Sequence, residues 1–307
     1  MIALLSRVGL LAIALGLSAL LALLGCGRKD GVAPIRSHFN LGVAHFDDQQ
    51  WDAAAASYRR ALSEDPSDRR ARFNLAVTLE LAARDAADEV EAAQLRTQSA
   101  EELEELLRRH PDDLRAMLNL AALAGEQDGL DAGRTKYQSA TEAHPRSAEA
   151  FAAYASFLLG QEEPEDSADQ AQRALAIDPG SFAGNVALGD AKLALGDLDT
   201  AAEAYETALR THPDQPVVLR TLARLEFERG RAEEAEVYAR RALLIDPDAP
   251  AVHRLASRIA EQQGAIESAV YHTWRARDLS SSPEQAERDR QTLSRLYGRL
   301  TTASAAE

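Results

Sequence analysis

The chain has 307 residues, of which 46% are hydrophobic and 5% aromatic, and its formal net charge is −15. This is ample apolar material for a stacked helical core, and the Ala-rich, aromatic-poor composition gives no indication of a strand-rich fold. The negative charge argues against nucleic acid as the main partner, because phosphate binding needs a strongly positive face. An acidic surface that keeps an extended chain soluble explains the charge without any acid chemistry.

Residues 1–25 are typical of a targeting segment rather than of the fold. Arg7 supplies a positive charge, and no charged residue occurs between Val8 and Leu24. Cys26 is the only cysteine, so an intramolecular disulfide is impossible. The order Leu23-Leu24-Gly25-Cys26 resembles the bacterial lipoprotein signal, in which the cysteine sulfur receives the lipid. The resemblance implies cleavage and lipidation, for instance with palmitate, at Cys26; the alternative is an uncleaved single-pass anchor.

Either anchor predicts a location outside the cytoplasm, on a membrane of the bacterial cell envelope. Residues 26–34 are then a short tether. The eight residues from Cys26 to Ala33 span at most about 28 Å when extended, which favours partners that are themselves at the membrane. Gly27 replaces the aspartate that holds lipoproteins of enteric bacteria at the inner membrane, which predicts the outer membrane where the host has one.

Proline marks a regular repeat in the remaining chain. Five prolines are spaced 34 residues apart, and a sixth precedes them by 45 residues: Pro111, Pro145, Pro179, Pro213 and Pro247, preceded by Pro66. Each proline is expected to end a helix, because it has no amide N–H and disfavours helical dihedral angles in the residue before it. A fixed period of this length indicates one supersecondary unit repeated in space.

The segment from Leu188 to Pro213 shows the whole unit. Leu188 and Gly189 lie midway along a first helix, Gly196-Asp197 makes the turn, and small or aromatic residues line a second helix, namely Ala201, Tyr205 and Ala208. These positions resemble the tetratricopeptide repeat family, a helix–turn–helix unit of 34 residues. The first repeat carries the same pattern at Leu41, Gly42, Ala54, Tyr58, Ala61 and Pro66. The resemblance implies an all-α, right-handed solenoid of about seven repeats over residues 35–281.

Two segments depart from the regular repeat. The second repeat, residues 69–113, contains 11 extra residues. The inserted stretch has no Pro or Gly and is rich in Ala, Glu, Leu and Arg, which predicts three extra helical turns rather than a loop. Beyond residue 281, Ser282 is typical of an N-cap, with Pro283 at the first helical position and Gln285 as the capping-box partner. Residues 282–307 are therefore expected to form a capping helix and tail.

No pattern of catalytic or metal-binding residues emerges. His110, His144 and His212 each precede a repeat proline, which suits helix C-terminal residues. There is no Gly-rich phosphate loop, nucleophile elbow or His-Glu-x-x-His motif, and no second cysteine for zinc. We expect a protein that is not an enzyme and that uses neither metal nor cofactor.

The resemblance also implies a concave groove lined by positions 2, 5, 9 and 12 of each repeat. In the first three repeats several of these positions are apolar: Phe39, Val43, Phe46, Phe73, Val77 and Leu118. Such a stripe fits a peptide or helix laid into a groove. The alternative is that these side chains pack against the neighbouring helix.

Positions 5 and 9 of the sixth and seventh repeats are arginines: Arg220, Arg224, Arg254 and Arg258. The two members of each pair are one helical turn apart and share a face, so a four-arginine cluster is predicted. Arginine recognises carboxylate or phosphate with two parallel hydrogen bonds, and the expected ligand is an acidic peptide or chain terminus. The alternative is that Glu228 and Glu261 neutralise these arginines.

Together these features predict a membrane-anchored, extracytoplasmic lipoprotein that acts as a protein–protein interaction scaffold in cell-envelope assembly. Two narrower roles fit the same architecture. One is a pilotin-like factor for type IV or tight-adherence pilus or secretin assembly. The other is a scaffold for polysaccharide, cell-wall or cytochrome biogenesis machinery. The sequence does not distinguish between these pathways.

Overall fold

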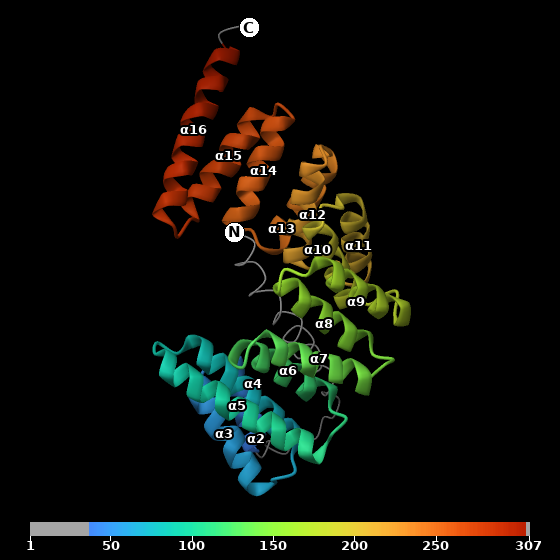
Figure 1. Ribbon diagram of the computed structural model, residues 1–307. Helices are drawn as coiled ribbons and strands as arrows, with labels where there is room; N and C mark the ends of the chain where they lie inside the picture. The colour runs from blue at the N-terminus through green and yellow to red at the C-terminus, as the bar shows by residue number, and fades with distance from the viewer. Residues whose placement is uncertain (1–36, 305–307) are drawn as a thin grey trace, which may run out of the picture. The chain divides into compact units, whose positions relative to one another are not determined.

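The computed structural model describes residues 37–304, and within this range every regular element is a helix (Figure 1). The helices are α2 (His38–Asp47), α3 (Trp51–Glu64), α4 (Arg69–Asp85), α5 (Glu89–Arg109), α6 (Leu114–Gln127), α7 (Leu130–Ala143), α8 (Ala148–Gly160), α9 (Pro164–Ile177), α10 (Phe182–Ala194), α11 (Leu198–Thr211), α12 (Pro216–Glu228), α13 (Ala232–Ile245), α14 (Pro250–Gln262), α15 (Ile266–Asp278) and α16 (Pro283–Ser304). The predicted all-α fold is confirmed.

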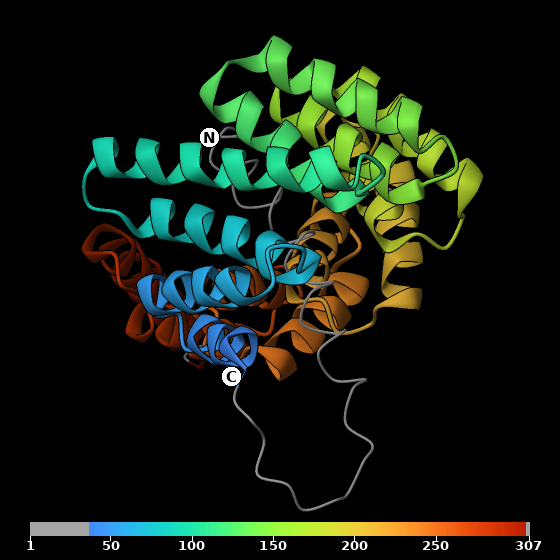
Figure 2. The same cartoon turned by 90° about the horizontal axis from the view of Figure 1, so that it is seen from below.

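The described chain forms two compact units. Unit 1 comprises α2–α8 and ends at Glu163, and unit 2 comprises α9–α16 and begins at Pro164. Inside each unit every helix packs against the next one along the chain. Figure 2 shows this for α2–α5, the blue to teal helices, which lie side by side in order. A stack of this kind gives each short helix the apolar neighbours that it needs on both sides.

The repeat prolines follow helix ends. The residue before the proline is the C-cap in five repeats: Asp65, His110, His144, His212 and Asp246. Each C-cap donates its backbone N–H to the carbonyl four residues earlier, and the proline then cannot continue the helix. The predicted roles of the prolines and of the three histidines are confirmed. The sharp turns within three later repeats contain Gly196, Gly230 and Gly264 at φ values of 78–79°, which side chains with a Cβ rarely adopt.

Glycine and alanine occupy the places where paired helices cross. The Gly42 backbone lies so near the Tyr58 ring that an added Cβ would be 2.6 Å from it. Gly189 has the same relation to Tyr205, at 2.7 Å. Both tyrosines are almost completely buried. The small residues of the repeat pattern therefore make room for a large aromatic side chain on the partner helix. This explains why a glycine on the first helix recurs together with a tyrosine on the second.

The extra length of the second repeat is helical. Helix α4 has 17 residues and α5 has 21, whereas α6–α15 have 13 or 14 each, and only residues 86–88 separate α4 from α5. The longer α5 remains attached to its neighbours. Ser99 donates to the Ala76 carbonyl at 2.8 Å, and Arg59 of α3 donates to Gln98 at 2.8 Å. The extension is thus an integral part of unit 1.

Helix α16 covers the last repeat (Figure 1). Ser282 accepts a hydrogen bond from the Gln285 N–H, as the N-cap prediction required. The apolar face of α16 buries Leu293 and Leu296, and Leu296 packs with Ala260 and Ala269. Since these contacts bury an otherwise open apolar face, the helix acts as the predicted cap.

Candidate partner-binding surfaces

The apolar residues of the first helix are only half-exposed. Phe39, Val43 and Phe46 pack against the core cluster of Ala54, Ala55, Tyr58, Leu75 and Leu79. The Phe39 and Tyr58 ring centroids are 5.9 Å apart, and those of Phe46 and Trp51 are 5.4 Å apart. These side chains contribute mainly to hairpin packing, with part of each side chain left at the surface.

The remaining apolar residues of the predicted groove are more deeply buried. Phe73 is 9% exposed and packs with Leu103, Leu106, Ala116, Leu120 and Leu123. The Arg115 guanidinium also covers its ring at 5.0 Å. Val77 and Leu118 are half-buried against neighbouring clusters. Phe73 is thus a core residue and not a groove residue, because the register places a side chain on a helix face but does not show which helix covers that face.

One of the four arginines of the predicted cluster, Arg254, already binds a carboxylate of the same chain. The guanidinium of Arg254 binds both oxygens of Asp289 at 2.9–3.1 Å and also the Ser280 hydroxyl at 3.0 Å. Asp289 is buried, and it lies 35 residues further along the chain on α16. Arg254 therefore secures the capping helix and is not open to a ligand, which corrects the prediction.

Arg224 and Arg258 remain exposed and accessible to a ligand, and we call them the arginine pair. Both side chains are exposed, and neither forms an ion pair with a described residue. The Arg258 guanidinium lies over the Phe227 ring, 4.7 Å from its centroid. Arg220 is half-buried in a small hollow that Asp246 also lines.

The carboxylates proposed to neutralise these arginines do not do so. Glu261 is bound instead by Arg295 and Arg299, at 2.9 and 2.6 Å, and these arginines lower its pKa. Glu228 forms no ion pair within residues 37–304. Neither carboxylate therefore compensates the positive charge of the arginine pair.

One acidic residue near this surface was not singled out from the sequence. Asp190 of α10 accepts a hydrogen bond of 2.5 Å from the Tyr205 hydroxyl. Burial raises the Asp190 pKa to about 6, and the pKa of Tyr205 is raised by burial and by the Asp190 charge, against a smaller opposing effect of Arg224. The sequence does contain a signal for this placement, because Asp190, Arg224 and Arg258 follow each other at the repeat interval of 34 residues.

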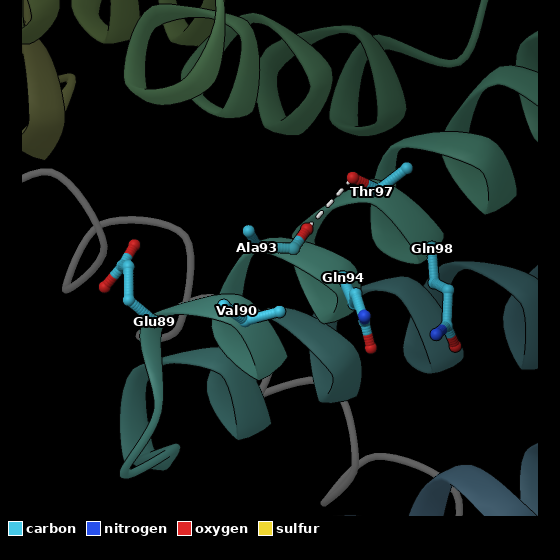
Figure 3. A pocket seen from close by; sticks show the side chains of 6 residues that line it. All are labelled: Glu89, Val90, Ala93, Gln94, Thr97 and Gln98. Atoms are coloured by element: carbon cyan, nitrogen blue, oxygen red, sulfur yellow. Dashed lines mark hydrogen bonds between the residues drawn. The ribbon is translucent and has the colours of Figure 1, made fainter.

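A second surface lies on the N-terminal half of α5. Figure 3 shows the six side chains that line a shallow hollow there: Glu89, Val90, Ala93, Gln94, Thr97 and Gln98. Only Glu89 is charged, and Val90 is 63% exposed. All six belong to one helix, so the hollow is a face of α5 and not an enclosed site.

No three His, Cys, Asp or Glu side chains of residues 37–304 converge as metal ligands would. Among the same residues, no helix combines the length and the apolar character needed to cross a membrane. The predicted lipidation site Cys26 and the signal segment lie outside the described residues.

Models of the tetratricopeptide repeat (TPR) match residues 35–68, 121–182 and 192–259, together more than half of the chain. The chain belongs to the tetratricopeptide repeat family. The matched segments of this TPR protein include α2 and α3 of unit 1, where Gly42 meets Tyr58, and α11–α13 of unit 2. No curated protein matches the sequence significantly.

Solved structures share the fold at low sequence identity. PilF from Pseudomonas aeruginosa superimposes with a TM-score of 0.57 at 19% identity, over 73% of this chain and 99% of its own. PilW, a type IV pilus biogenesis factor, gives 0.55 at 21% identity, over 69% and 97%. The human IFIT1 dimer with m7Gppp-AAAA gives 0.60 at 17% identity, over 88% and 64%. Identities this low establish the fold alone.

Proposed function

We propose that this TPR protein is a protein-interaction scaffold held at the bacterial cell envelope. The observation that carries the proposal is the alignment of equivalent side chains on successive helix pairs, as in the exposed Arg224 and Arg258. Such a stack presents a long, regular surface on which a peptide or helix can make the same kind of contact several times.

The envelope location rests on the sequence of the N-terminal segment. An uncharged apolar run that ends in Leu-Leu-Gly-Cys supports a lipid anchor at Cys26. A tether of a few residues then holds the first helix close to the membrane, so the partner would also lie there.

Assembly of a type IV pilus is the narrower role with specific support. PilW is a type IV pilus biogenesis factor, and 97% of its chain superimposes on this one. Under this alternative, deletion of the gene removes secretin multimers from the outer membrane. Under the general scaffold proposal, the multimers persist and the partner belongs to another envelope pathway.

A protein is favoured over nucleic acid as the partner because of charge, not fold. The IFIT1 structure contains m7Gppp-AAAA on the same fold, so helix pairs of this kind are compatible with an RNA ligand. The net charge of −15 on the present chain would repel a polyanion over most of its surface.

Site-specific photo-crosslinking in cells tests the scaffold proposal. The reactive residue replaces Arg224 and, as a matched control, Leu244 on α13, which is 80% exposed. We expect a protein adduct from position 224 that is absent at position 244. Equal labelling at both positions, or no adduct at position 224, would contradict the proposal that this surface binds a partner.

A further inference from the structure

We infer that His253 and His272 form an acid-sensitive latch, which closes the hairpin of α14 and α15 in the last repeat. A hydrogen bond between the two imidazoles holds the hairpin together at neutral pH, and acid breaks this bond. The latch is a property of the fold itself, so the inference goes beyond the proposed function and does not depend on it.

The two imidazole rings point directly at each other. Their Nδ1 atoms are 3.0 Å apart, whereas their ring centroids are 5.3 Å apart. Rings whose nitrogens approach this closely while their centres stay this far apart meet edge to edge, which is the geometry of a straight hydrogen bond. His253 of α14 is buried and His272 of α15 is half-buried, so water competes little for this contact.

A second contact determines which nitrogen donates. Nε2 of His253 lies 3.0 Å from the Pro247 carbonyl oxygen. A carbonyl oxygen can only accept, so this Nε2 carries a hydrogen and donates it. Nδ1 of the neutral His253 ring is then an acceptor, and Nδ1 of His272 is the donor. The two rings are therefore joined only while Nδ1 of His253 is unprotonated.

Protons can enter the pair in two steps. The first can bind Nε2 of His272, which makes that ring a cation and leaves the hydrogen bond in place. The second has to bind Nδ1 of His253, because every other ring nitrogen then carries a hydrogen. Two N–H groups would face each other across 3.0 Å, so the contact is lost.

The surroundings of the pair oppose its positive charge. Burial lowers the pKa of His272, and His253 lowers it further. From α13, Glu236 acts in the opposite direction, but it already binds Arg240 and Gln263. The charged groups of the adjoining loop and of α12, α14, α15 and α16 are grouped among themselves: Arg275 with Asp248, Arg254 with Asp289, and Arg220 beside Asp246.

The sign of the pH effect follows from the lowered pKa of His272. Below its ordinary value of 6.5 the unfolded chain binds more protons at this residue than the folded protein does. The free energy of unfolding contributed by the pair therefore falls as the pH falls. This is opposite to the effect of Asp190, which lies on α10 in another repeat.

The interior of the last hairpin is more polar than that of the regular repeats. Ser257 and Thr273 stand in the register of Gly189 and Tyr205, and their hydroxyls share a buried hydrogen bond of 2.6 Å. This bond lies one turn from His253, where the regular repeat packs a large aromatic ring. A hairpin that is joined by a few buried hydrogen bonds depends strongly on each of them.

An earlier repeat contains the same contact without a titratable group. Asn185 lies two repeat intervals before His253 and is equally buried. Its side-chain amide donates to the Pro179 carbonyl at 3.1 Å, just as His253 donates to the Pro247 carbonyl. Asparagine can therefore replace the histidine in this register and keep the loop contact.

Opening of the latch would reach the surface of unit 2. Helix α16 packs on α15 (Figure 1), and α14 carries Arg258 of the arginine pair. Acid would thus loosen the cap and alter the proposed partner-binding surface. Only this last consequence rests on the proposed function.

Hydrogen exchange of the purified protein tests the latch, with rates corrected for the intrinsic pH dependence of exchange. We expect protection of residues 250–278 to fall about tenfold or more between about pH 7.5 and pH 5, since one unit of pKa difference corresponds to a factor of ten. Helices α10 and α11 should lose no protection. In H253N the change should stay below about threefold, because an amide does not titrate. The control H212N removes an exposed histidine and should behave as wild type.

An equal loss of protection in H253N, or no loss in wild type, would overturn the inference. A loss in α10–α11 as large as that in α14–α15 would do the same, because it would indicate general acid unfolding. Nitrogen-15 NMR of the imidazoles needs no substitution. At neutral pH it should show His253 protonated at Nε2 and not at Nδ1, and the opposite tautomer would contradict the latch.

Discussion

Individual residues at the helix crossings explain much of the repeat pattern. Gly42 and Gly189 each face a buried tyrosine ring on the second helix of the pair, at distances that leave no space for a methyl group. The contacting atoms belong to a rigid ring rather than to a flexible chain end, so the tyrosine cannot move aside without a large energetic cost. Glycine is thus required here by packing and not by backbone conformation.

A glycine-to-alanine comparison tests this requirement. We expect G189A to lower the free energy of unfolding by about 1–3 kcal/mol, as overpacking does elsewhere. The control is G298A on α16, where an added Cβ meets nothing within 4 Å. This change should be neutral or stabilising by about 0.5–1 kcal/mol, because alanine favours the helix. Urea denaturation measures both, and equal stability of the two variants would contradict the packing argument.

Asp190 should make the stability depend on pH. Its folded pKa of about 6 lies above its ordinary value of 3.8 because the group is desolvated. Between these values the folded protein binds more protons than the unfolded chain, so the free energy of unfolding falls as the pH rises through this window. We expect D190N to be more stable than wild type at pH 7.5 by about 1–3 kcal/mol and to lack this decline.

A nearby acidic residue provides the control. Asp197 caps α11, and hydrogen bonds from Thr200 lower its pKa. D197N should therefore retain the decline in stability between about pH 4 and 6 that Asp190 produces. Thermal melts from pH 4 to 8 decide the matter, and a D190N profile parallel to that of wild type would refute the assignment.

At the level of elements, α16 is held by three kinds of contact with the last repeat. Leu296 packs into an apolar cluster, Asp289 binds Arg254, and Glu261 of α14 binds Arg295 and Arg299. The Arg254–Asp289 pair is the most shielded of the ionic contacts, because Asp289 is buried. Loss of one partner would leave an unpaired charge in a poorly solvated place.

Hydrogen exchange should detect this loss locally. We expect D289A to destabilise α16 by about 2–3 kcal/mol, less than for a fully buried pair because Arg254 is partly exposed. Protection should fall in residues 283–304 and remain unchanged in α10–α11. E287A on the same helix removes the exposed pair with Arg290 and should cost less than about 1 kcal/mol. Equal exchange in the two variants would show that the buried pair has no special role.

For the whole molecule, the proposed attachment to the membrane through Cys26 is open to a direct test. Stable anchoring by lipid requires about two acyl chains or more, each contributing about 0.8 kcal/mol per buried methylene group. We expect the wild-type protein in the membrane fraction and C26S in the soluble fraction, with incorporation of a palmitate analogue only in wild type. Retention of C26S in the membrane would favour the uncleaved single-pass anchor.

The net charge of the whole molecule also limits the distance over which it can attract an acidic partner. Because the net charge is −15 and the arginine pair is locally positive, an acidic segment is attracted only over a short range. Binding of an acidic partner segment to the arginine pair should therefore weaken strongly as the salt concentration increases, since the Debye length is about 10 Å at 0.1 M ionic strength. Salt-independent binding would indicate apolar recognition instead.

The sequence by itself determined the repeated unit. The spacing of the prolines, the Gly–Tyr pattern and the Ser282-Pro283 start of the last helix are local signals, because they depend on dihedral angles, hydrogen bonds and packing within one helix pair. The extra residues of the second repeat were also predicted as helix from composition alone, and α4 and α5 contain them.

Only the tertiary structure decided which side chains remain open. Phe73 and Arg254 occupy the same register positions as other groove candidates, but α5 and α6 bury Phe73, and Asp289 of α16 binds Arg254. Each of these partners lies 30 or more residues away along the chain or on a helix outside the regular repeat. A periodic pattern determines on which face of a helix a residue lies. Whether another helix buries that face depends on contacts between helices, which no local signal encodes.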